Sequence, residues 1–422
     1  MNLYDELKYR GFIDNITSDQ LIEKLNTKSL CYYIGFDPSA DSFHIGQYAV
    51  FNLMRILSRH GHKTIALMGG ATGMIGDPSG KNKERNLLDE EQLQHNISRL
   101  EEQFKKFLDF SSSKTIILNN HDWLGKFSFL DFLRDVGKNF SVNTMIARDS
   151  VSSRLNREGE GITFTEFSYM ILQAYDFYYI NKNYDCSLQV GGSDQWGNIV
   201  SGIDLTRRLS GNEVYGLTIP LVTKSDGTKF GKSEGQAIWL SADKTPPYDL
   251  YQFLVRQSDE DVIKFLKVLT TLDKTEIESL EESVRSEPHL RRAQKRLAQE
   301  VVSTLHGEDV LAKILKAVEA IYSSEIVNID AQLIQDIFRD SPSFEIAFCK
   351  LDEGWQIINA LAESGLCDSK SKARKLIESG GFYLNNEKQT NVDINLTREN
   401  LLKDRFMVFR SGKKNYMLIK AH

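Results

Sequence analysis

Five short stretches of this 422-residue chain contain residues that can bind a negatively charged ligand. The first, residues 35–47, reads GFDPSADSFHIGQ, and its Asp37, Ser39 and His44 can contact a ligand. An apolar, strand-like run precedes it and an amphipathic, helix-like pattern follows it. Such a junction places donors and a helix N-terminus at the carboxyl end of a sheet, where anions bind in open α/β folds. Considered alone, a loop histidine is more often structural.

The second stretch, residues 69–81, is rich in glycine and reads GGATGMIGDPSGK. It lacks the G-x-x-x-x-G-K spacing of a Walker A loop, and Asn82 stands where that motif has Ser or Thr. Its glycines allow the backbone to approach a ligand closely, which would place the Asp77 carboxylate beside that ligand. A flexible surface turn is the alternative.

The third stretch, residues 166–176, reads EFSYMILQAYD and places Tyr169, Gln173 and Asp176 at positions i, i+4 and i+7. This spacing puts the three side chains on one helix face. Two neutral hydrogen-bonding groups and a carboxylate suit a pocket for a small molecule that carries an amine and a hydroxyl. A solvated face is the alternative, although the apolar neighbours favour burial.

The last two stretches are another strand–glycine–helix junction, QVGGSDQWGN at 189–198, and a polar loop, TKSDGTKFGKS at 223–233. Asp194 lies in the first turn of the expected helix, where it can accept from ribose hydroxyls or act only as a helix-start acid. The lysines of the loop are Lys224, Lys229 and Lys232. A mobile loop of this kind can bring ammonium groups over phosphates, whereas a lysine-rich loop taken alone is usually just surface.

These stretches need a scaffold, and the pattern from residue 30 to about 222 predicts one. The expected strands are 31–36, 64–68, 115–119, 187–190 and 217–222, and the expected helices are 46–59, 89–109, 165–180 and 193–209. Strands that alternate with helices indicate an α/β fold, a parallel sheet with crossover helices.

The domain organisation expected from the sequence has four parts. An α/β domain covers 1–245, with an insertion at about 125–163. After Pro246-Pro247 an all-helical domain covers 246–325, 326–353 forms a connector, and a small α+β domain covers 354–422. The insertion carries apolar residues that can form core or a subunit interface: Phe127, Phe129, Leu130, Phe132, Leu133, Val136 and Phe140.

Charge is distributed unevenly along the chain. Residues 354–422 carry 12 Lys and Arg against 7 Asp and Glu, whereas the remainder carries 40 against 51. A basic C-terminal module suits contact with a polyanion, and a solvated surface explains the excess equally well. No apolar run reaches membrane-spanning length, and four separated cysteines predict a reduced, cytoplasmic protein without a structural zinc site.

The motifs HIGQ (44–47) and KFGKS (229–233) resemble the paired nucleotide motifs of class I aminoacyl-tRNA synthetases. Longer segments, GFDPSADSFHIG, GDPSGK, YMILQAYD and QVGGSDQWGN, are similar to those of bacterial-type tyrosyl-tRNA synthetases. The resemblance extends over essentially the whole chain. It implies a Rossmann-like catalytic domain, and residues 354–422 resemble an RNA-binding domain shared with a ribosomal small-subunit protein.

The resemblance also implies roles for individual residues. Tyr33 and Asp176 would bind the phenol of tyrosine, and Asp77, Tyr169 and Gln173 its ammonium group. The implied ATP site consists of Gly35, Asp37, Ser39, His44, Gly46, Gln47, Gly192, Asp194, Lys229 and Lys232. The implied catalytic residues are Ser39, His44, Gln195, Lys229 and Lys232, with Lys81 and Arg85 nearby.

The implied activity is that of a tyrosine–tRNA ligase, which forms tyrosyl-adenylate and pyrophosphate and then transfers tyrosine to the 3′-terminal adenosine of tRNA. ATP would be used with Mg²⁺, without a permanently bound cofactor, a protein-held metal or a covalent enzyme nucleophile. Phenylalanine would leave the phenol-binding groups without a partner, so no editing domain is expected.

The resemblance implies tRNA as the macromolecular partner and a homodimer with the insertion at its interface. The candidate tRNA contacts of the C-terminal domain are Lys370, Lys372, Arg374, Lys375, Arg410, Lys413 and Lys414. Arg207 and Arg208 are candidates for contacts to the acceptor arm.

Two positions depart from the family pattern, and two other functions compete with the one it implies. Gln47 stands where the family commonly has His, and Ile34 stands where Cys is common, so we expect an altered ATP affinity. Tryptophanyl-tRNA synthetases share the fold, but Tyr33 paired with Asp176 favours a phenol. An RNA-binding protein that lost catalysis is disfavoured by the retained site residues.

Overall fold

The computed structural model describes residues 1–79, 88–111, 114–148, 151–152, 155, 161–233, 236–320, 324–339, 341–412 and 415–422. The side chains of residues 232, 233, 236 and 324 are also outside this description. The chain divides into two compact units, Met1–Lys244 with Gln257–Leu297, and Thr245–Arg256 with Ala298–His422. Among the described residues, no helix is long and apolar enough to cross a membrane.

The first unit contains a six-stranded sheet with the order β1-β6-β5-β2-β3-β4. Its strands are β1 (Asn15–Ile16), β2 (Cys31–Phe36), β3 (Lys63–Met68), β4 (Thr115–Asn119), β5 (Leu188–Gly192) and β6 (Tyr215–Ile219). All neighbouring pairs are parallel except β1 with β6. The expected α/β fold with a parallel sheet is therefore confirmed, and the short antiparallel edge strand β1 was not predicted.

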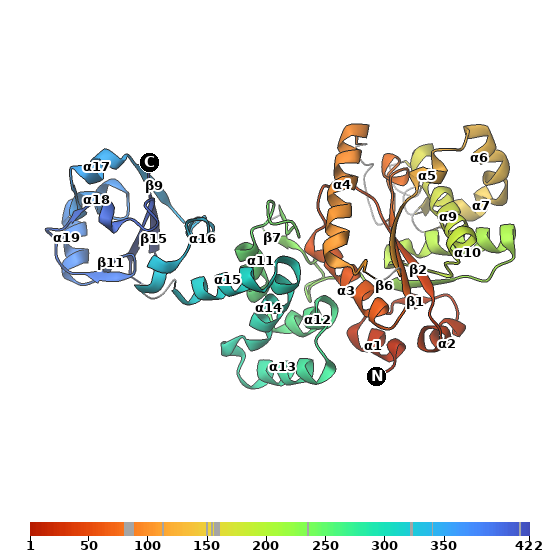
Figure 1. Cartoon of the computed structure of the whole chain (residues 1–422), viewed down its shortest axis with the longest axis horizontal. Helices are drawn as coiled ribbons and strands as arrows, with labels where there is room; N and C mark the ends of the chain where they lie inside the picture. Colours follow the sequence, from red (N-terminus) through yellow and green to blue (C-terminus); the bar gives the residue numbers. More distant parts are fainter. Residues whose placement is uncertain are drawn as a thin grey trace. The chain divides into compact units, whose positions relative to one another are not determined.

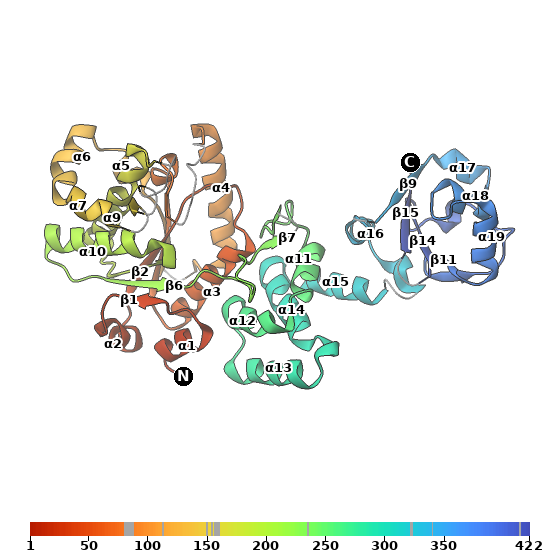
Figure 2. The ribbon, with the colours of Figure 1, turned by 180° about the vertical axis from the view of Figure 1, so that it is seen from behind.

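Four crossover helices cover the two faces of this sheet. They are α3 (Ile45–Arg59), α4 (Glu90–Phe107), α9 (Phe164–Tyr184) and α10 (Trp196–Ser210). Figures 1 and 2 show α3 and α4 on one side of the sheet and α9 and α10 on the other. Local chemistry sets their ends: Thr163 and Glu166 form a capping box before α9, and Gly211 ends α10 in a left-handed conformation.

Packed aromatic rings fix β2 against α3 and α4. Phe36, Phe43, Phe51 and Phe104 lie with ring centroids 4.8–5.6 Å apart. Burying each ring contributes about 1.5–3 kcal/mol to folding. The junction between β2 and α3, residues 37–44, is therefore supported by a dense core on one side.

The inserted segment forms short helices, among them α6 (Phe129–Asp135), η2 (Gly137–Asn139) and α7 (Val142–Ile146). Its apolar residues divide into two groups. Phe127, Phe132, Val136 and Phe140 belong to a cluster that contains Ala174 of α9. Phe129, Leu130 and Leu133 are 67%, 75% and 41% exposed.

The α-helices between residues 246 and 320 are α11 (Pro247–Val255), α12 (Asp259–Leu269), α13 (Lys274–Ser286), α14 (Arg292–His306) and α15 (Glu308–Ala320). Among these, α12 and α13 lie in the first unit, and α11 and α15 in the second. Pro247 occupies the first position of α11, where its missing N–H costs nothing.

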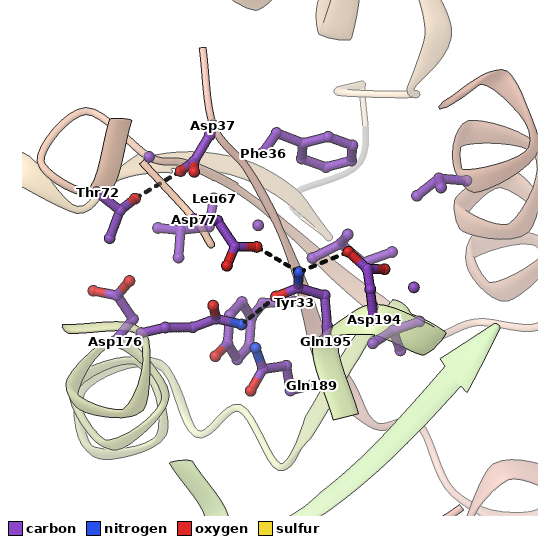
Figure 3. Close-up of a pocket in the computed structure, with 18 of the residues that line it drawn as sticks. Tyr33, Phe36, Asp37, Leu67, Thr72, Asp77, Asp176, Gln189, Asp194 and Gln195 are labelled. Carbon is purple, nitrogen blue, oxygen red and sulfur yellow. Dashed lines mark hydrogen bonds between the residues drawn. The ribbon is translucent and has the colours of Figure 1, made fainter. Parts of the chain in front are cut away.

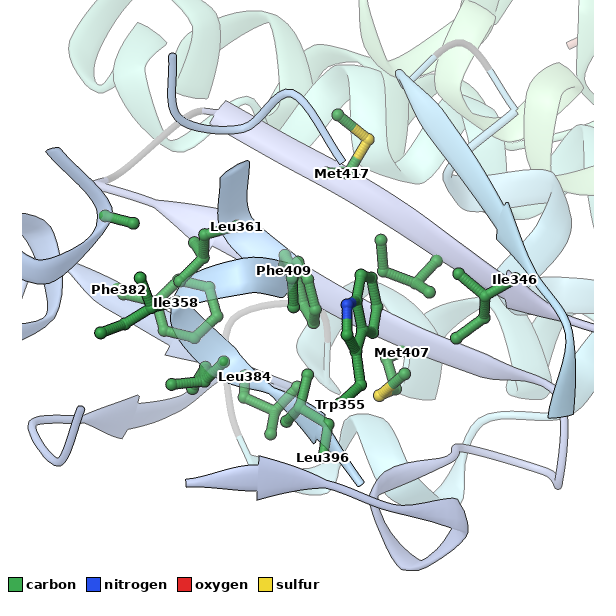
Figure 4. Packing of buried hydrophobic residues seen from close by; sticks show 14 of the residues in the cluster. Ile346, Trp355, Ile358, Leu361, Phe382, Leu384, Leu396, Met407, Phe409 and Met417 are labelled. Carbon is green, nitrogen blue, oxygen red and sulfur yellow. The ribbon is translucent and has the colours of Figure 1, made fainter. Parts of the chain in front are cut away.

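The second unit also contains a five-stranded sheet with the order β12-β11-β14-β15-β9. Its strands are β9 (Ser343–Ile346), β11 (Phe382–Leu384), β12 (Glu387–Gln389), β14 (Phe406–Ser411) and β15 (Asn415–Ala421). The strand β9 lies within the segment expected to be a connector and pairs in parallel with β15. The core beside this sheet contains the buried side chains of Trp355, Phe382 and Phe409, which Figure 4 shows. Buried residues of α18 (Ile357–Glu363) and α19 (Lys370–Glu378) belong to the same cluster.

Candidate active site

A cavity of about 300 Å³ opens at the carboxyl ends of β2 and β5, beside α9. Four of the five stretches singled out in the sequence contribute to its lining, with Gly35, Asp37, Ser39, Gln47, Asp77, Tyr169, Gln173, Asp176, Gly192, Asp194 and Gln195. Tyr33 of β2 also lines it, whereas no described residue of the lysine-rich stretch 223–233 does. Figure 3 shows Tyr33, Asp37, Asp77, Asp176, Asp194 and Gln195 around this cavity. This position at the carboxyl edge of a parallel sheet is typical of ligand sites in α/β folds.

One end of the cavity presents a phenol and a carboxylate. The Tyr33 side chain is fully buried, and its hydroxyl has no hydrogen-bond partner in the described structure. The Asp176 carboxylate accepts from Asn120 Nδ2 at 3.0 Å and from Trp123 Nε1 at 2.8 Å. Burial nevertheless raises the pKa of Asp176 to about 7. A buried hydroxyl without a partner beside such a carboxylate can bind a ligand hydroxyl.

A second set of hydrogen bonds joins this end to Asp37, the residue that follows β2. Asn120 Nδ2 also donates to Thr72 Oγ1, which in turn donates to Asp37 Oδ1 at 2.8 Å. The Tyr169 hydroxyl donates to the other oxygen of Asp37 at 3.0 Å. Burial, together with the Asp37 charge, raises the pKa of Tyr169, so this hydroxyl stays protonated and remains a donor. The Asp37 carboxylate is therefore held from both sides.

The floor of the cavity is an amide and carboxylate network. Gln195 Nε2 donates to Asp77 Oδ2 at 2.6 Å, and Gln195 Oε1 accepts from Gln173 Nε2 at 3.1 Å. Asn198 Nδ2 donates to Gln173 Oε1 at 3.0 Å, which fixes the orientation of that amide. The site thus offers the Asp77 carboxylate and amide oxygens together, a combination that suits an ammonium group.

The wall opposite α9 is formed by the turn after β5. Burial, together with the Asp77 charge, raises the pKa of Asp194, and the hydrogen bond from Gln195 and, more weakly, the ammonium group of Lys229 oppose this shift. A Cβ atom on Gly192 would lie 2.5 Å from Asp194 Oδ1, so a side chain there would displace the carboxylate. Similarly, a Cβ atom on Gly69 would lie 2.2 Å from Asp37 Oδ1. Glycine at these places keeps two carboxylates close to the backbone.

The N-terminus of α3 is closed by its own side chains. His44 is the N-cap residue and is half-buried, and its backbone N–H donates to Gln47 Oε1 at 3.1 Å. Gln47 is therefore the N3 residue of a capping box, and it also lines the cavity. His44 itself is not part of the cavity lining.

The lysine loop, residues 223–233, reaches the start of α3. A Cβ atom on Gly231 would lie 2.9 Å from Ile45 Cγ2 and 3.1 Å from the Gly46 nitrogen. Ile238 connects the two segments, because its N–H donates to the Gly231 carbonyl and its carbonyl accepts from the Ile45 N–H. Lys229 is exposed at this edge of the site.

Two family models match the chain. The model "tRNA synthetases class I (W and Y)" matches residues 25–323, and the model "Tyrosine--tRNA ligase SYY-like C-terminal domain" matches residues 333–419. The chain belongs to the class I tRNA synthetases. It is 48% identical over 420 residues to a tyrosine–tRNA ligase of Staphylococcus haemolyticus, covering 99% of this chain and 98% of that protein.

Solved structures of the same class are also similar. A C-terminally truncated mitochondrial tyrosyl-tRNA synthetase of Aspergillus nidulans gives a TM-score of 0.69 at 31% identity, covering 76% of this chain and 94% of that one. The corresponding protein of Coccidioides posadasii gives 0.64 at 30% identity, with coverages of 75% and 91%. A tryptophanyl-tRNA synthetase of Encephalitozoon cuniculi gives 0.53 at 14% identity, which shows a shared fold alone.

Most of the synthetase residues expected from the sequence meet in this one region. The cavity lining includes all five expected tyrosine-binding residues. His44 and Gly46 lie beside the cavity at the start of α3, and Lys229 lies on the adjoining loop. Lys81, Arg85 and the side chain of Lys232 lie outside the described residues.

Five polar residues of the site were not predicted: Thr72, Asn120, Trp123, Gln189 and Asn198. Asn120 and Trp123 follow directly after β4, in the segment NNHDW at 119–123. Polar residues at the carboxyl end of a predicted parallel strand are a signal for a site, and that signal was available here. Thr72 lies within the glycine-rich stretch, in which only Asp77 was expected to contact a ligand.

The candidate tRNA contacts differ in their surroundings. Arg207 pairs with Asp204, and Arg208 donates to the Asn139 carbonyl. On α19, Lys372 pairs with Asp368 and Arg374 lies 3.9 Å from Glu378, whereas Lys370 and Lys375 are exposed to solvent.

Arg410 lies over the Tyr383 ring, 3.7 Å from its centroid. Lys413 and Lys414 are outside the described residues. Arg410 Nη1 donates to the Gly412 carbonyl at 2.8 Å and Nε is buried, so part of this guanidinium group is already enclosed by the protein.

Proposed function

We propose that the cavity binds tyrosine with its phenol between Tyr33 and Asp176, and that the chain uses it as a tyrosine–tRNA ligase. The observation that carries this assignment is the buried Tyr33 hydroxyl without a partner beside the Asp176 carboxylate. A tyrosine phenol can donate to Asp176 and accept from Tyr33, which satisfies both groups. Phenylalanine would leave the Tyr33 hydroxyl without a partner and would offer no donor to Asp176, which would keep only its bonds from Asn120 and Trp123.

The other end of the substrate would lie on the amide network. The tyrosine ammonium group would meet Asp77, Tyr169 and Gln173, which supply a carboxylate and two oxygen acceptors. Gln195 bridges Asp77 and Gln173, so it would lie where the substrate carboxylate approaches the α-phosphate of ATP. The ribose and adenine would follow the glycine-bordered wall with Gly35, Gly192 and Asp194.

The chemistry needs positioning and charge stabilisation more than covalent catalysis. The tyrosine carboxylate attacks the α-phosphorus, the bond to the β-phosphate bridging oxygen breaks, and pyrophosphate leaves. Ser39, His44 and the α3 N-terminus, with Lys229 and Lys232 opposite, would stabilise the leaving charge. ATP would enter as its Mg²⁺ complex, as a substrate. The tRNA 3′-terminal ribose hydroxyl then attacks the tyrosyl carbonyl, and AMP leaves.

The proposal also covers the oligomeric state, the tRNA contacts, the cellular location and the domain organisation. The exposed Phe129, Leu130 and Leu133 of the insertion would form the interface of a homodimer. Basic residues of the C-terminal domain and Arg207 and Arg208 would contact tRNA phosphates. A cytoplasmic location is proposed because ATP and tRNA are available there. We also propose that the chain has the four-part domain organisation expected from its sequence. The strand β9 is then counted in the C-terminal domain, because it pairs with β15 in the five-stranded sheet of that domain.

An amino-acid-dependent ATP–pyrophosphate exchange assay tests the proposal. Exchange should occur with tyrosine and should be absent with phenylalanine and without an amino acid. Exchange driven by tryptophan would favour a tryptophan enzyme, and no exchange with any amino acid would favour an RNA-binding protein. Either of these results would overturn the assignment. Tyr33→Phe should retain exchange but weaken the discrimination against phenylalanine.

A further inference from the structure

The lysine loop is held at its base by a helix distant in sequence, α12. The buried Asp261 carboxylate accepts from the Ser225 backbone N–H at 2.7 Å, and the Lys264 ammonium donates to the Thr223 carbonyl at 2.7 Å. Lys264 also lies 3.3 Å from Thr223 Oγ1. Two side chains one helical turn apart therefore bind two backbone groups of the same loop.

The part of the loop beyond this base is a compact turn. The Lys224 N–H donates to the Thr228 carbonyl, and the Gly227 N–H donates to the Lys224 carbonyl. Asp226 accepts from both the N–H and the hydroxyl of Thr228. A turn with these internal bonds moves as one body. Its orientation is consequently set where it is attached, at Thr223 and Ser225.

The exit of the loop is attached to the same helix by an aromatic contact. The rings of Phe230 and Phe265 lie 4.2 Å apart between centroids, and both side chains are buried. Lys229 directly precedes this anchor and remains exposed. The helix α12 thus contacts the lysine loop at Thr223 and Ser225, where the loop begins, and again at Phe230, directly after Lys229.

Hydrogen bonds from Arg10 and Asn52 hold the C-terminal end of α12. Arg10 donates to the carbonyls of Lys267, Thr270 and Leu272, with distances of 2.7–3.0 Å. Asn52, on α3, donates to the carbonyls of Val268 and Thr270. Because α3 also carries His44 and Gln47 at its N-terminus, α12 connects the two motifs that would enclose the triphosphate. The connection runs through backbone groups.

We propose that Asp261 and Lys264 are positioning residues that hold the lysine loop in register with the N-terminus of α3 for adenylate formation. This inference rests on the proposed function, because it concerns the pyrophosphate end of that same site. Neither side chain touches the reacting atoms; both act through the loop. A loop that is already oriented loses less entropy when its ammonium groups meet the transition state.

The test is tyrosine-dependent ATP–pyrophosphate exchange by full-length Lys264→Met and Asp261→Ala. In both variants kcat should fall by about tenfold, because a displaced loop stabilises the leaving charge poorly. The dissociation constant for tyrosine, measured without ATP, should be unchanged, since the tyrosine pocket is formed by other elements. Asp261→Asn should restore kcat, because its amide oxygen can accept from the Ser225 N–H.

The matched control is Lys267→Met, one helical turn further along α12. Lys267 lies over the Tyr9 ring, 4.7 Å from its centroid, so this change removes an ammonium group of the same helix away from the loop. Its kcat should stay within about twofold of the wild type. Wild-type-like exchange by Lys264→Met, or an equal loss in Lys264→Met and Lys267→Met, would overturn the inference. An inactive wild type would instead contradict the proposed function.

Discussion

The proposed tyrosine site depends most on Asp176. The sequence predicted the helix face that carries this residue, but not the side chains that donate hydrogen bonds to it. The helical spacing of Tyr169, Gln173 and Asp176 predicted a shared polar face, and all three line the cavity. The donors Asn120 and Trp123 could not be assigned to Asp176, because that contact joins residues more than 50 positions apart. Local patterns identify a helix face, and tertiary contacts decide what that face meets.

Tyrosine binding should release a proton below about pH 7. Burial raises the pKa of Asp176 in the free protein to about 7, so the carboxyl group is largely protonated at pH 6. A phenol that donates to the carboxylate favours the charged form and lowers this pKa. Calorimetric titration at pH 6 in buffers of different ionisation enthalpy should therefore detect release of about one proton, and none at pH 8.

Asp176→Asn is the control for this measurement. It should bind tyrosine more weakly at all pH values and should lose the difference in proton release between pH 6 and 8. Equal proton release by the wild type and Asp176→Asn would refute the assignment of the released proton to Asp176.

The raised pKa of Asp176 also predicts a pH dependence of folding. The free wild type should lose stability as the pH rises from about 4 to about 7, because the carboxyl group ionises in the unfolded chain before it ionises in the folded one.

Gln47 carries two roles that a substitution can separate. Its side-chain oxygen accepts from the His44 N–H, and its side chain also lines the cavity. Gln47→Glu retains the capping acceptor and adds negative charge to the first turn of α3, so the melting temperature should stay equal or rise. The new charge near the triphosphate should raise the KM for ATP by about fivefold, or about 1 kcal/mol. Tyrosine affinity without ATP should not change.

Gln47→Ala provides the opposite case. It removes the capping bond and should lower the free energy of unfolding by about 1 kcal/mol. An unchanged KM for ATP in Gln47→Glu would show that residue 47 acts on the helix alone.

At the scale of elements, the sequence predicted strongly periodic segments well and weak ones poorly. The strands β2 and β4 have the expected bounds, since they are continuous apolar runs followed by polar residues. β1 has two residues and β9 has four, which is too short for a periodic signal. β9 also pairs with β15, more than 70 positions later, so its place in a sheet depends on a contact that local sequence cannot specify.

The lysine loop gives an element-scale prediction through its glycines. Gly231 has φ of +97°, and an added Cβ atom would meet Ile45 and Gly46. Gly231→Ala should therefore push the loop away from α3, lower the free energy of unfolding by about 2–4 kcal/mol and reduce kcat for exchange. Thermal unfolding and exchange at saturating substrates measure the two effects.

Gly227→Ala is the matched control in the same loop. Gly227 also has a positive φ, +80°, but nothing lies within 4 Å of an added Cβ atom. Only backbone strain of about 1 kcal/mol is expected there. Equal losses in both variants would mean that left-handed backbone strain, and not the contact with α3, explains the effect of Gly231→Ala.

At the scale of the whole molecule, two surface features go beyond what one subunit needs. Positive charge is concentrated in residues 354–422, and exposed apolar side chains gather on the insertion. The sequence identified both segments, but it could not divide the apolar residues of the insertion. Phe132 of α6 and Val136 just after it pack on α9, whereas Phe129 and Leu130 of α6 remain exposed. One face of α6 is core, and the other is available to a partner.

A second copy of this chain is the partner that we expect on that face. In solution the protein should have twice the 48.1 kDa mass of the chain. Leu130 is 75% exposed, so Leu130→Asp should leave the fold intact and place a charge in the interface. Light scattering after size exclusion should then give a single-chain mass. Leu221→Asp is the control, because Leu221 is 45% exposed and lies outside the insertion. A single-chain mass for the wild type, or dissociation by Leu221→Asp as well, would contradict an interface on α6, since charge at any exposed leucine would then have the same effect.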